Sequence, residues 1–273
     1  MQKIWGMESH PTIAILSPNC PEYPMVYFGS IAVGATVTTI NAAYTPAEIA
    51  NHLLDSEADM LVVDSILEPA VDAALQIIQK NMLVVVNGAS KKGRPNLQDI
   101  IKDTNIPFGK ETEFNPDCIA TLPYSSGTTG KPKGVSISQS AINGTMGIYH
   151  FPEARSIEKA EGDHQDIIMG LLPFFHIYGM MTIMASGLTL GTKIVTLPRF
   201  DPRTYASMLR EKKMTMLHTV PPLLQFIASS PAVTRKDLSH VHSVMCGAAA
   251  VPPVSAMALK EKAGHPIFFQ EGE

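Results

Sequence analysis

The sequence predicts an α/β fold in which mixed, mainly parallel sheets are covered by helices on both faces. Short apolar runs alternate with amphipathic stretches along the chain, and such unbroken apolar runs are typical of strands buried on both sides. Of the 273 residues, 45% are hydrophobic and 17% are charged. This composition suits a large core and excludes a disordered, collagen-like or coiled-coil chain. The length predicts one or two domains.

The expected strands are short apolar runs bounded by polar or turn-forming residues. They are Thr12–Leu16, Thr36–Ile40, Met60–Asp64, Met82–Val86, Ile119–Leu122, Val135–Ser138, Ile167–Leu172, Lys193–Leu197, Met214–Leu217, Ser243–Cys246 and Pro266–Phe269.

The clearest helix start lies at Thr45–Glu48. Thr45 can cap the helix, Pro46 suits its first turn, and Glu48 completes a capping box, so a helix is expected to run towards Leu54. Further helices are expected at Glu68–Gln79, Asp201–Glu211, Pro222–Ser229 and Pro252–Lys262.

Two polar stretches, Gly88–Pro95 and Asp103–Asp117, are predicted to be linkers because they are rich in glycine or proline and lack periodicity. The second would separate two α/β subdomains, residues 1–115 and 116–273.

The stretch 167–191 contains no Asp, Glu, Lys or Arg and is long enough to span a bilayer. Pro173 and several glycines interrupt it. We therefore favour a buried strand, a turn at Pro173 and a buried helix after His176 over a transmembrane segment.

Charge and cysteine content exclude several classes of site. The net charge is −4, so no basic surface for nucleic acid is expected. Cys20, Cys118 and Cys246 are widely spaced and form no zinc-binding pattern, which favours a reducing, intracellular compartment. The N-terminus lacks the apolar run of a signal peptide.

The segment Tyr124–Val135 reads YSSGTTGKPKGV and lies between two predicted strands. Glycines let backbone N–H groups approach an anion, hydroxyls donate to phosphate oxygens, and lysines add positive charge. Pro132 stands where a Walker motif has its second glycine, so a Walker-type NTPase is disfavoured. Any one of these residues by itself would fit an ordinary surface loop. The complete twelve-residue segment in this order favours a polyphosphate-binding site instead.

This segment resembles the phosphate-loop signature of the AMP-forming acyl-CoA synthetase, luciferase and adenylation-domain superfamily, most similarly to its 4-coumarate–CoA ligase-like members. Other segments resemble further motifs of that family, namely Ala14–Glu22, Thr38–Glu48, Leu172–Gly179, Val195–Phe200, Thr219–Leu223 and Cys246–Ala250. The resemblance therefore implies the large N-terminal domain of that fold.

In that family the loop binds the β- and γ-phosphates of ATP. The resemblance carries this role onto Ser125, Ser126, Gly127, Thr128, Thr129, Gly130, Lys131 and Lys133.

The resemblance also places His176 beside the acyl carboxylate as the candidate catalytic residue. From its spacing alone, His176 would be a core histidine, and its apolar flanks imply burial. Arg199 is either a solvated arginine or, by the resemblance, a contact for coenzyme A. The adenine and acyl pocket would include Tyr178, Gly247, Ala248, Ala249 and Gly272. Without the resemblance, close strand–helix packing would explain the small residues, and Ala250 departs from the family's proline.

The chain has Glu273 where the resemblance predicts an aromatic residue followed by the acid that holds magnesium. The ribose-binding acid and the C-terminal lid domain of the family are also missing, and the start looks shortened. We therefore expect a partial large domain, incomplete at both ends.

The resemblance implies a ligase that uses ATP, magnesium and coenzyme A. A carboxylic acid would be activated as an acyl-adenylate and transferred to coenzyme A, in the cytoplasm or the peroxisome. The chain alone is expected to be inactive. The alternatives are an adenylating enzyme with another acceptor, such as a peptide-synthetase domain or a luciferase-like oxygenase, and a non-catalytic nucleotide-binding remnant.

Overall fold

The computed structural model describes residues 10–105, 115–125, 132–155 and 157–271. The chain divides into two compact units, residues 1–143 and 144–273, each with its own sheet. The division falls later than the boundary near residue 115 that the linker-like composition suggested. The boundary lies later because the three strands between residues 119 and 138 belong to the first sheet.

The sheet of the first unit has the order β4-β3-β1-β2-β5-β6, and β7 also pairs with β5. The strands from β4 to β5 run parallel, whereas β6 and β7 are antiparallel to β5. The bounds are β1 Thr12–Leu16, β2 Thr36–Ile40, β3 Met60–Asp64, β4 Leu83–Asn87, β5 Ile119–Ser125, β6 Lys133–Gly134 and β7 Ile137–Ser138.

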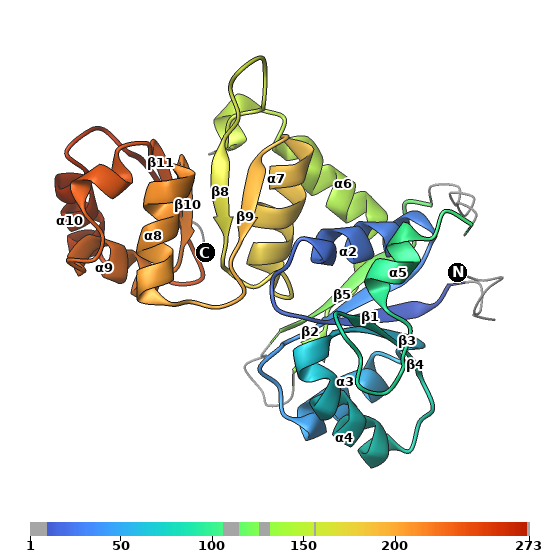
Figure 1. Ribbon diagram of the computed structural model, residues 1–273. Helices are drawn as coiled ribbons and strands as arrows, with labels where there is room; N and C mark the ends of the chain where they lie inside the picture. Colours follow the sequence, from blue (N-terminus) through green and yellow to red (C-terminus); the bar gives the residue numbers. More distant parts are fainter. Residues whose placement is uncertain (1–9, 106–114, 126–131, 156, 272–273) are drawn as a thin grey trace. The chain divides into compact units, whose positions relative to one another are not determined.

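Helices cover both faces of this sheet (Figure 1). Helices α3 (Pro46–Asp55) and α4 (Glu68–Ile78) bury Leu53 and Val71 against Ala14 and Leu16 of β1. On the other face, α2 (Glu22–Ala32) and α5 (Leu97–Lys102) pack beside Ile13. Neighbouring residues of β1 thus face opposite cores, which is why its sequence is apolar throughout.

The second unit has a parallel sheet in the order β12-β11-β10-β8-β9. Its strands are β8 Ile167–Gly170, β9 Lys193–Thr196, β10 Met216–Thr219, β11 Ser243–Cys246 and β12 Phe268–Glu271. Its helices are α8 Pro202–Lys212, α9 Pro221–Ser229, α10 Pro253–Ala263, the π-helix η3 Tyr178–Ala185 and α7 Ser186–Thr189. Helix α6 (Gln139–Ile148) runs across the division, and 3-10 turns lie at Ser65–Leu67, Pro152–Ala154 and Arg235–Leu238.

Helices α8, α9 and α10 share one core with one face of this sheet, which includes Leu217 and Val244. Alternation along β10 sends Met216 and His218 to the opposite face. There, Gly187 of α7 lets the helix approach Ile168 of β8, since a Cβ at this glycine would lie 3.2 Å from the Ile168 Cδ1 atom. Both sheets are therefore two-sided, and the predicted α/β class is confirmed.

Most predicted elements are present, with small shifts. The capping box of α3 is confirmed, because the Glu48 N–H donates to the Thr45 Oγ1 atom and the Thr45 N–H donates to Glu48. Strands β10 and β12 lie two residues later than predicted, where they pair in register with β11. Helices α2, α5 and α6 were not predicted; α2 carries Pro24 and Gly29, which hide its periodicity.

One local prediction needs correction, and another is confirmed. The stretch Gly88–Pro95 is held to α4 rather than being a free linker, because Ser90 and Arg94 both donate to the buried Glu68 carboxylate. The apolar stretch 167–191 forms β8, η3 and α7, so the predicted buried strand followed by a buried helix after His176 is confirmed. Within the described residues, no helix has the length and apolar character needed to cross a membrane.

Candidate functional site

The two described ends of the phosphate-loop motif meet as a short antiparallel ladder. Ser125, the last residue of β5, pairs with Lys133 of β6, and Tyr124 pairs with Gly134. The Val135 N–H closes the ladder by donating to the Pro123 carbonyl over 2.9 Å. Ser125 and Lys133 are exposed beyond the carboxyl end of β5, as a phosphate-binding pair requires. The other predicted loop residues, Ser126, Gly127, Thr128, Thr129, Gly130 and Lys131, lie outside the described residues.

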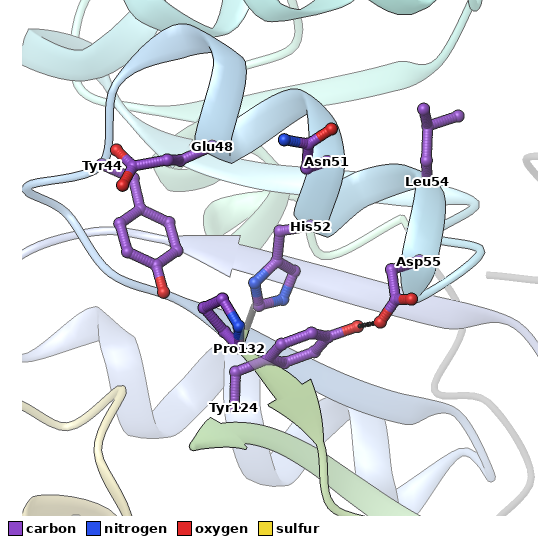
Figure 2. A pocket seen from close by; sticks show the side chains of 8 residues that line it. All are labelled: Tyr44, Glu48, Asn51, His52, Leu54, Asp55, Tyr124 and Pro132. Atoms are coloured by element: carbon purple, nitrogen blue, oxygen red, sulfur yellow. Dashed lines mark hydrogen bonds between the residues drawn. The ribbon is translucent and has the colours of Figure 1, made fainter. Parts of the chain in front are cut away.

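Tyr124, at the base of this ladder, contacts two side chains of α3. Its hydroxyl donates to the Asp55 Oδ2 atom over 2.6 Å, and its ring lies over His52 with the ring centroids 3.8 Å apart. Figure 2 shows both contacts beside a cavity of about 540 Å³. The cavity is lined by Tyr44, Glu48, Asn51, His52, Leu54, Asp55, Tyr124 and Pro132.

His176 lies in the second unit, in the turn between β8 and η3. The prediction that its apolar flanks bury it is wrong, because the imidazole is exposed. The chain turns back over residues 173–176, and the His176 N–H donates to the Pro173 carbonyl. Gly179 then packs directly against that carbonyl, where any Cβ would collide. This turn leaves the ring of His176 exposed to solvent.

Tyr178 begins η3 and connects this turn to β11. Its hydroxyl donates to the Met245 carbonyl over 3.2 Å, and burial raises the pKa of the phenol above its usual value, so the group stays protonated. The Tyr178 N–H also contacts the His176 Nδ1 atom at 3.3 Å. The structure thus brings His176, Tyr178 and the end of β11 together.

Gly247, Ala248 and Ala249 follow β11 directly. Gly247 is buried and its N–H donates to the Thr219 carbonyl at the end of β10, while Ala248 and Ala249 are exposed. Ala248 has a φ of 69°, in the left-handed region that residues with a Cβ seldom occupy. Such strain is often found at functional sites.

Arg199 follows β9 and is exposed. Like His176 and Gly247, it lies at the carboxyl edge of the second sheet. Ligands of open α/β sheets bind at this edge. No contact joins Arg199 to them within the described residues. Gly272 lies outside those residues.

His218, which lies on β10, was not among the predicted site residues. Its ring packs edge-on against Tyr178, with the centroids 5.9 Å apart. The side chain is buried and neither ring nitrogen has a hydrogen-bond partner among the described residues, and burial lowers the pKa of the imidazole to about 3. The predicted strand Met214–Leu217 ends one residue before His218, so its place on the strand was not expected.

Magnesium, which the resemblance implies, finds no ligand set in the part of the chain that the structure describes. No group of three or more His, Cys, Asp or Glu side chains there could hold a metal ion. No metal-dependent step can therefore be derived from these residues.

A family model described as AMP-binding enzyme matches residues 2–271, nearly the entire chain. The chain belongs to this family.

Curated relatives include 4-coumarate–CoA ligases. Ligase 2 of Solanum tuberosum is 31% identical over 254 residues, which cover 89% of this chain and 44% of the relative. The ligase of Pinus taeda is 30% identical over 275 residues, covering 97% of this chain and 48% of the relative. The chain thus spans less than half the length of these relatives.

Solved structures share the fold. A red-emitting luciferase from Phrixothrix hirtus superposes with a TM-score of 0.84 at 23% identity, covering 97% of this chain and 51% of the luciferase. The inhibitor-bound N-terminal domain of FACL13 from Mycobacterium tuberculosis superposes with a TM-score of 0.83 at 21% identity. The match covers 98% of this chain and 63% of the FACL13 domain. An ATP-bound MatB from Rhodopseudomonas palustris superposes with a TM-score of 0.77 at 21% identity. The match covers 99% of this chain and 51% of MatB.

Proposed function

We propose that this chain supplies the phosphate-binding and acyl-binding parts of an ATP-dependent acid–thiol ligase of the 4-coumarate–CoA ligase-like type. The enzyme would join a carboxylic acid to AMP as an acyl-adenylate, release pyrophosphate, and transfer the acyl group to coenzyme A. The observation that carries the proposal is the family match over residues 2–271, together with curated relatives that are 4-coumarate–CoA ligases.

The phosphates of ATP would bind at the end of β5. Ser125 and Lys133 lie side by side on the ladder and are exposed, so a hydroxyl donor and an ammonium face solvent at one place. Hydrogen bonds that involve a charged partner are the strong ones, and they suit a phosphate group. Within this proposal the full phosphate-binding set is Ser125, Ser126, Gly127, Thr128, Thr129, Gly130, Lys131 and Lys133.

The acid and adenine would bind at the carboxyl edge of the second sheet. His176 would lie beside the acyl carboxylate, and its exposure leaves the ring accessible. Tyr178, fixed by the Met245 carbonyl, would form one wall of the pocket. Gly247, Ala248, Ala249 and Gly272 would complete the adenine and acyl pocket, and Arg199 would meet coenzyme A.

Acid-dependent exchange of pyrophosphate into ATP tests the adenylation half-reaction. The chain would be supplied with ATP, magnesium and a panel of aryl and fatty acids, with and without coenzyme A. Exchange that depends on one acid class supports the proposal and names the substrate. A chain that binds ATP without any exchange supports a non-catalytic nucleotide-binding role instead.

His176→Ala separates the acyl role from the phosphate role. In a protein extended to the length of the relatives, acid-dependent exchange should fall while ATP affinity is unchanged, because His176 would belong to the acyl site. His150→Ala is the matched control, since His150 is also an exposed histidine of the second unit. A collapse of ATP affinity in the His176 variant would assign this residue a structural role.

We also expect the 273-residue chain alone to form no thioester at a useful rate, because it spans about 44% of the length of relatives such as the Solanum tuberosum ligase. Positioning of reactants can contribute up to about 7–11 kcal/mol to catalysis, and it depends on the complete site. Robust turnover in a thioester assay would contradict this expectation.

A further inference from the structure

The base of the phosphate-loop motif is held by one side-chain cluster. The structure assigns a positioning role to His52, Asp55 and Tyr124, which we call the α3 anchor: it fixes the backbone that presents Ser125 and Lys133 to phosphate. This inference rests on the proposed function, because it concerns the ATP-binding half of that site.

Tyr124 is the point where both strands of the ladder are fixed. It directly precedes Ser125, and its backbone pairs with Gly134, which directly follows Lys133. A Cβ at Gly134 would lie 3.2 Å from the Cζ atom of Tyr124, so the returning strand rests on the tyrosine ring. Any shift of this ring moves both predicted phosphate ligands.

Helix α3 holds the ring from the other side (Figure 2). The Asp55 carboxylate accepts the Tyr124 hydroxyl over 2.6 Å, and the His52 ring lies 3.8 Å away at an interplanar angle of 34°. Burial and the neighbouring carboxylate of Asp55 raise the pKa of Tyr124, so the phenol remains a donor at any physiological pH.

His52 is itself fixed in a single tautomer. The Thr38 hydroxyl donates its single proton to the Leu122 carbonyl over 2.9 Å. Its oxygen lies 2.8 Å from the His52 Nε2 atom, and because the proton is already used, the oxygen accepts from the Nε2–H group. The Nδ1 atom is then an unprotonated acceptor, and within the described part of the chain it is buried without a partner. Burial lowers the pKa of His52 to about 4, which keeps the ring neutral. The anchor therefore presents a neutral ring in one orientation.

Calorimetric titration of ATP and of AMP against wild type and variants tests the anchor. Tyr124→Phe removes only the hydroxyl, Asp55→Ala removes its acceptor, and Asp55→Asn keeps a neutral acceptor. Tyr44→Phe is the matched control, because Tyr44 lines the same cavity and its hydroxyl has no hydrogen-bond partner within the described residues.

We expect Tyr124→Phe and Asp55→Ala to weaken ATP binding about fivefold, the net worth of roughly one hydrogen bond. AMP binding should stay within about twofold of wild type because AMP lacks the phosphates that this region would hold. Asp55→Asn should restore most of the ATP affinity, and Tyr44→Phe should change neither ligand. Amide hydrogen exchange at residues 124 and 133–135 should rise in the two weakened variants without any ligand.

The outcomes separate two failures. If wild type binds ATP and Tyr124→Phe binds it equally well, or if ATP and AMP weaken together, the anchor has no positioning role. If wild type binds neither nucleotide, the proposed function is overturned, and the positioning role with it. Loss of ATP affinity alone, with rescue by Asp55→Asn, supports the anchor.

Discussion

The carboxyl ends of the two sheets hold their polar side chains in different ways. At the end of β5, Tyr124 and His52 are fixed by hydrogen bonds to Asp55 and Thr38, and the His52 Nδ1 atom has no partner among the described residues. At the end of β10, His218 is buried, and neither of its ring nitrogens is paired within those residues. In the first region hydrogen bonds hold both rings and leave one buried nitrogen unpaired, whereas in the second the His218 ring makes no hydrogen bond to the described residues. Similar strand ends can therefore make opposite contributions to stability.

The largest expected effect concerns the first region. Lys131→Ala combined with Lys133→Ala should weaken ATP binding by about a hundredfold, because each charge-assisted hydrogen bond contributes roughly 1.5 kcal/mol at the low end of its range. Calorimetric titration measures the loss. The control is Lys91→Ala combined with Lys102→Ala, which removes two exposed lysines elsewhere in the same unit. If both double variants bound ATP with equal affinity, the assignment of the phosphate site to this region would be wrong.

Mild acid should destabilise both regions through their buried histidines. Burial lowers the pKa of His52 to about 4 and that of His218 to about 3, against about 6.5 when unfolded. Their contribution to stability is thus complete above pH 6.5 and is lost as pH falls towards these values. Between pH 6.5 and 5, the free energy of unfolding should drop by about 1.1 kcal/mol per pH unit for each histidine.

Urea unfolding at several pH values measures this slope, and carboxylates scarcely titrate in that window. The His218→Leu variant should show about half of the wild-type slope. A variant slope equal to that of wild type would mean that His218 is solvated or paired in solution.

At pH 7 the same two histidines should respond to substitution with opposite signs. His218→Leu should raise the free energy of unfolding by about 1 kcal/mol, because it removes a buried group with no partners. His52→Leu should lower it by about 1 kcal/mol, because it removes the hydrogen bond to Thr38 and the contact with Tyr124. Denaturant unfolding compares both variants with wild type. The same sign for both would show that the two regions do not differ as described.

The smallest effect concerns His242, at the opposite, amino end of the second sheet. Its Nε2 atom lies 2.9 Å from the buried Asp166 carboxylate, and this hydrogen bond raises the pKa of the half-exposed imidazole. A raised pKa gives stability that is present below about pH 6.5 and is lost as pH rises through the folded value.

For wild type we expect a loss of a few tenths of a kcal/mol between pH 6.5 and 8, the usual size for a partly exposed pair. His242→Gln should abolish this loss, and His240→Gln, an exposed neighbour, should keep it. An undiminished pH dependence in the His242 variant would assign the loss to other groups.

Local sequence predicted the elements but not their partners. The capping box at Thr45–Glu48 is contained in four consecutive residues, and the strands are visible as apolar runs. The bond between Tyr124 and Asp55 joins residues 69 positions apart, so no local pattern could indicate it. The exposure of His176 was likewise missed, because of its apolar neighbours only Phe174 is buried, and the turn leaves the His176 ring and Ile177 exposed.

By itself, the sequence determined the α/β class, the order of most strands and helices, the position of the phosphate-loop motif after a strand, and membership of the AMP-binding enzyme family. These properties follow from hydrophobic period, caps and motif spacing, which are local. The tertiary structure decided which face of β10 carries His218, which tautomer His52 adopts, and which helix holds Tyr124. Those properties depend on strand register and on burial, and burial arises only when distant segments of the chain pack together.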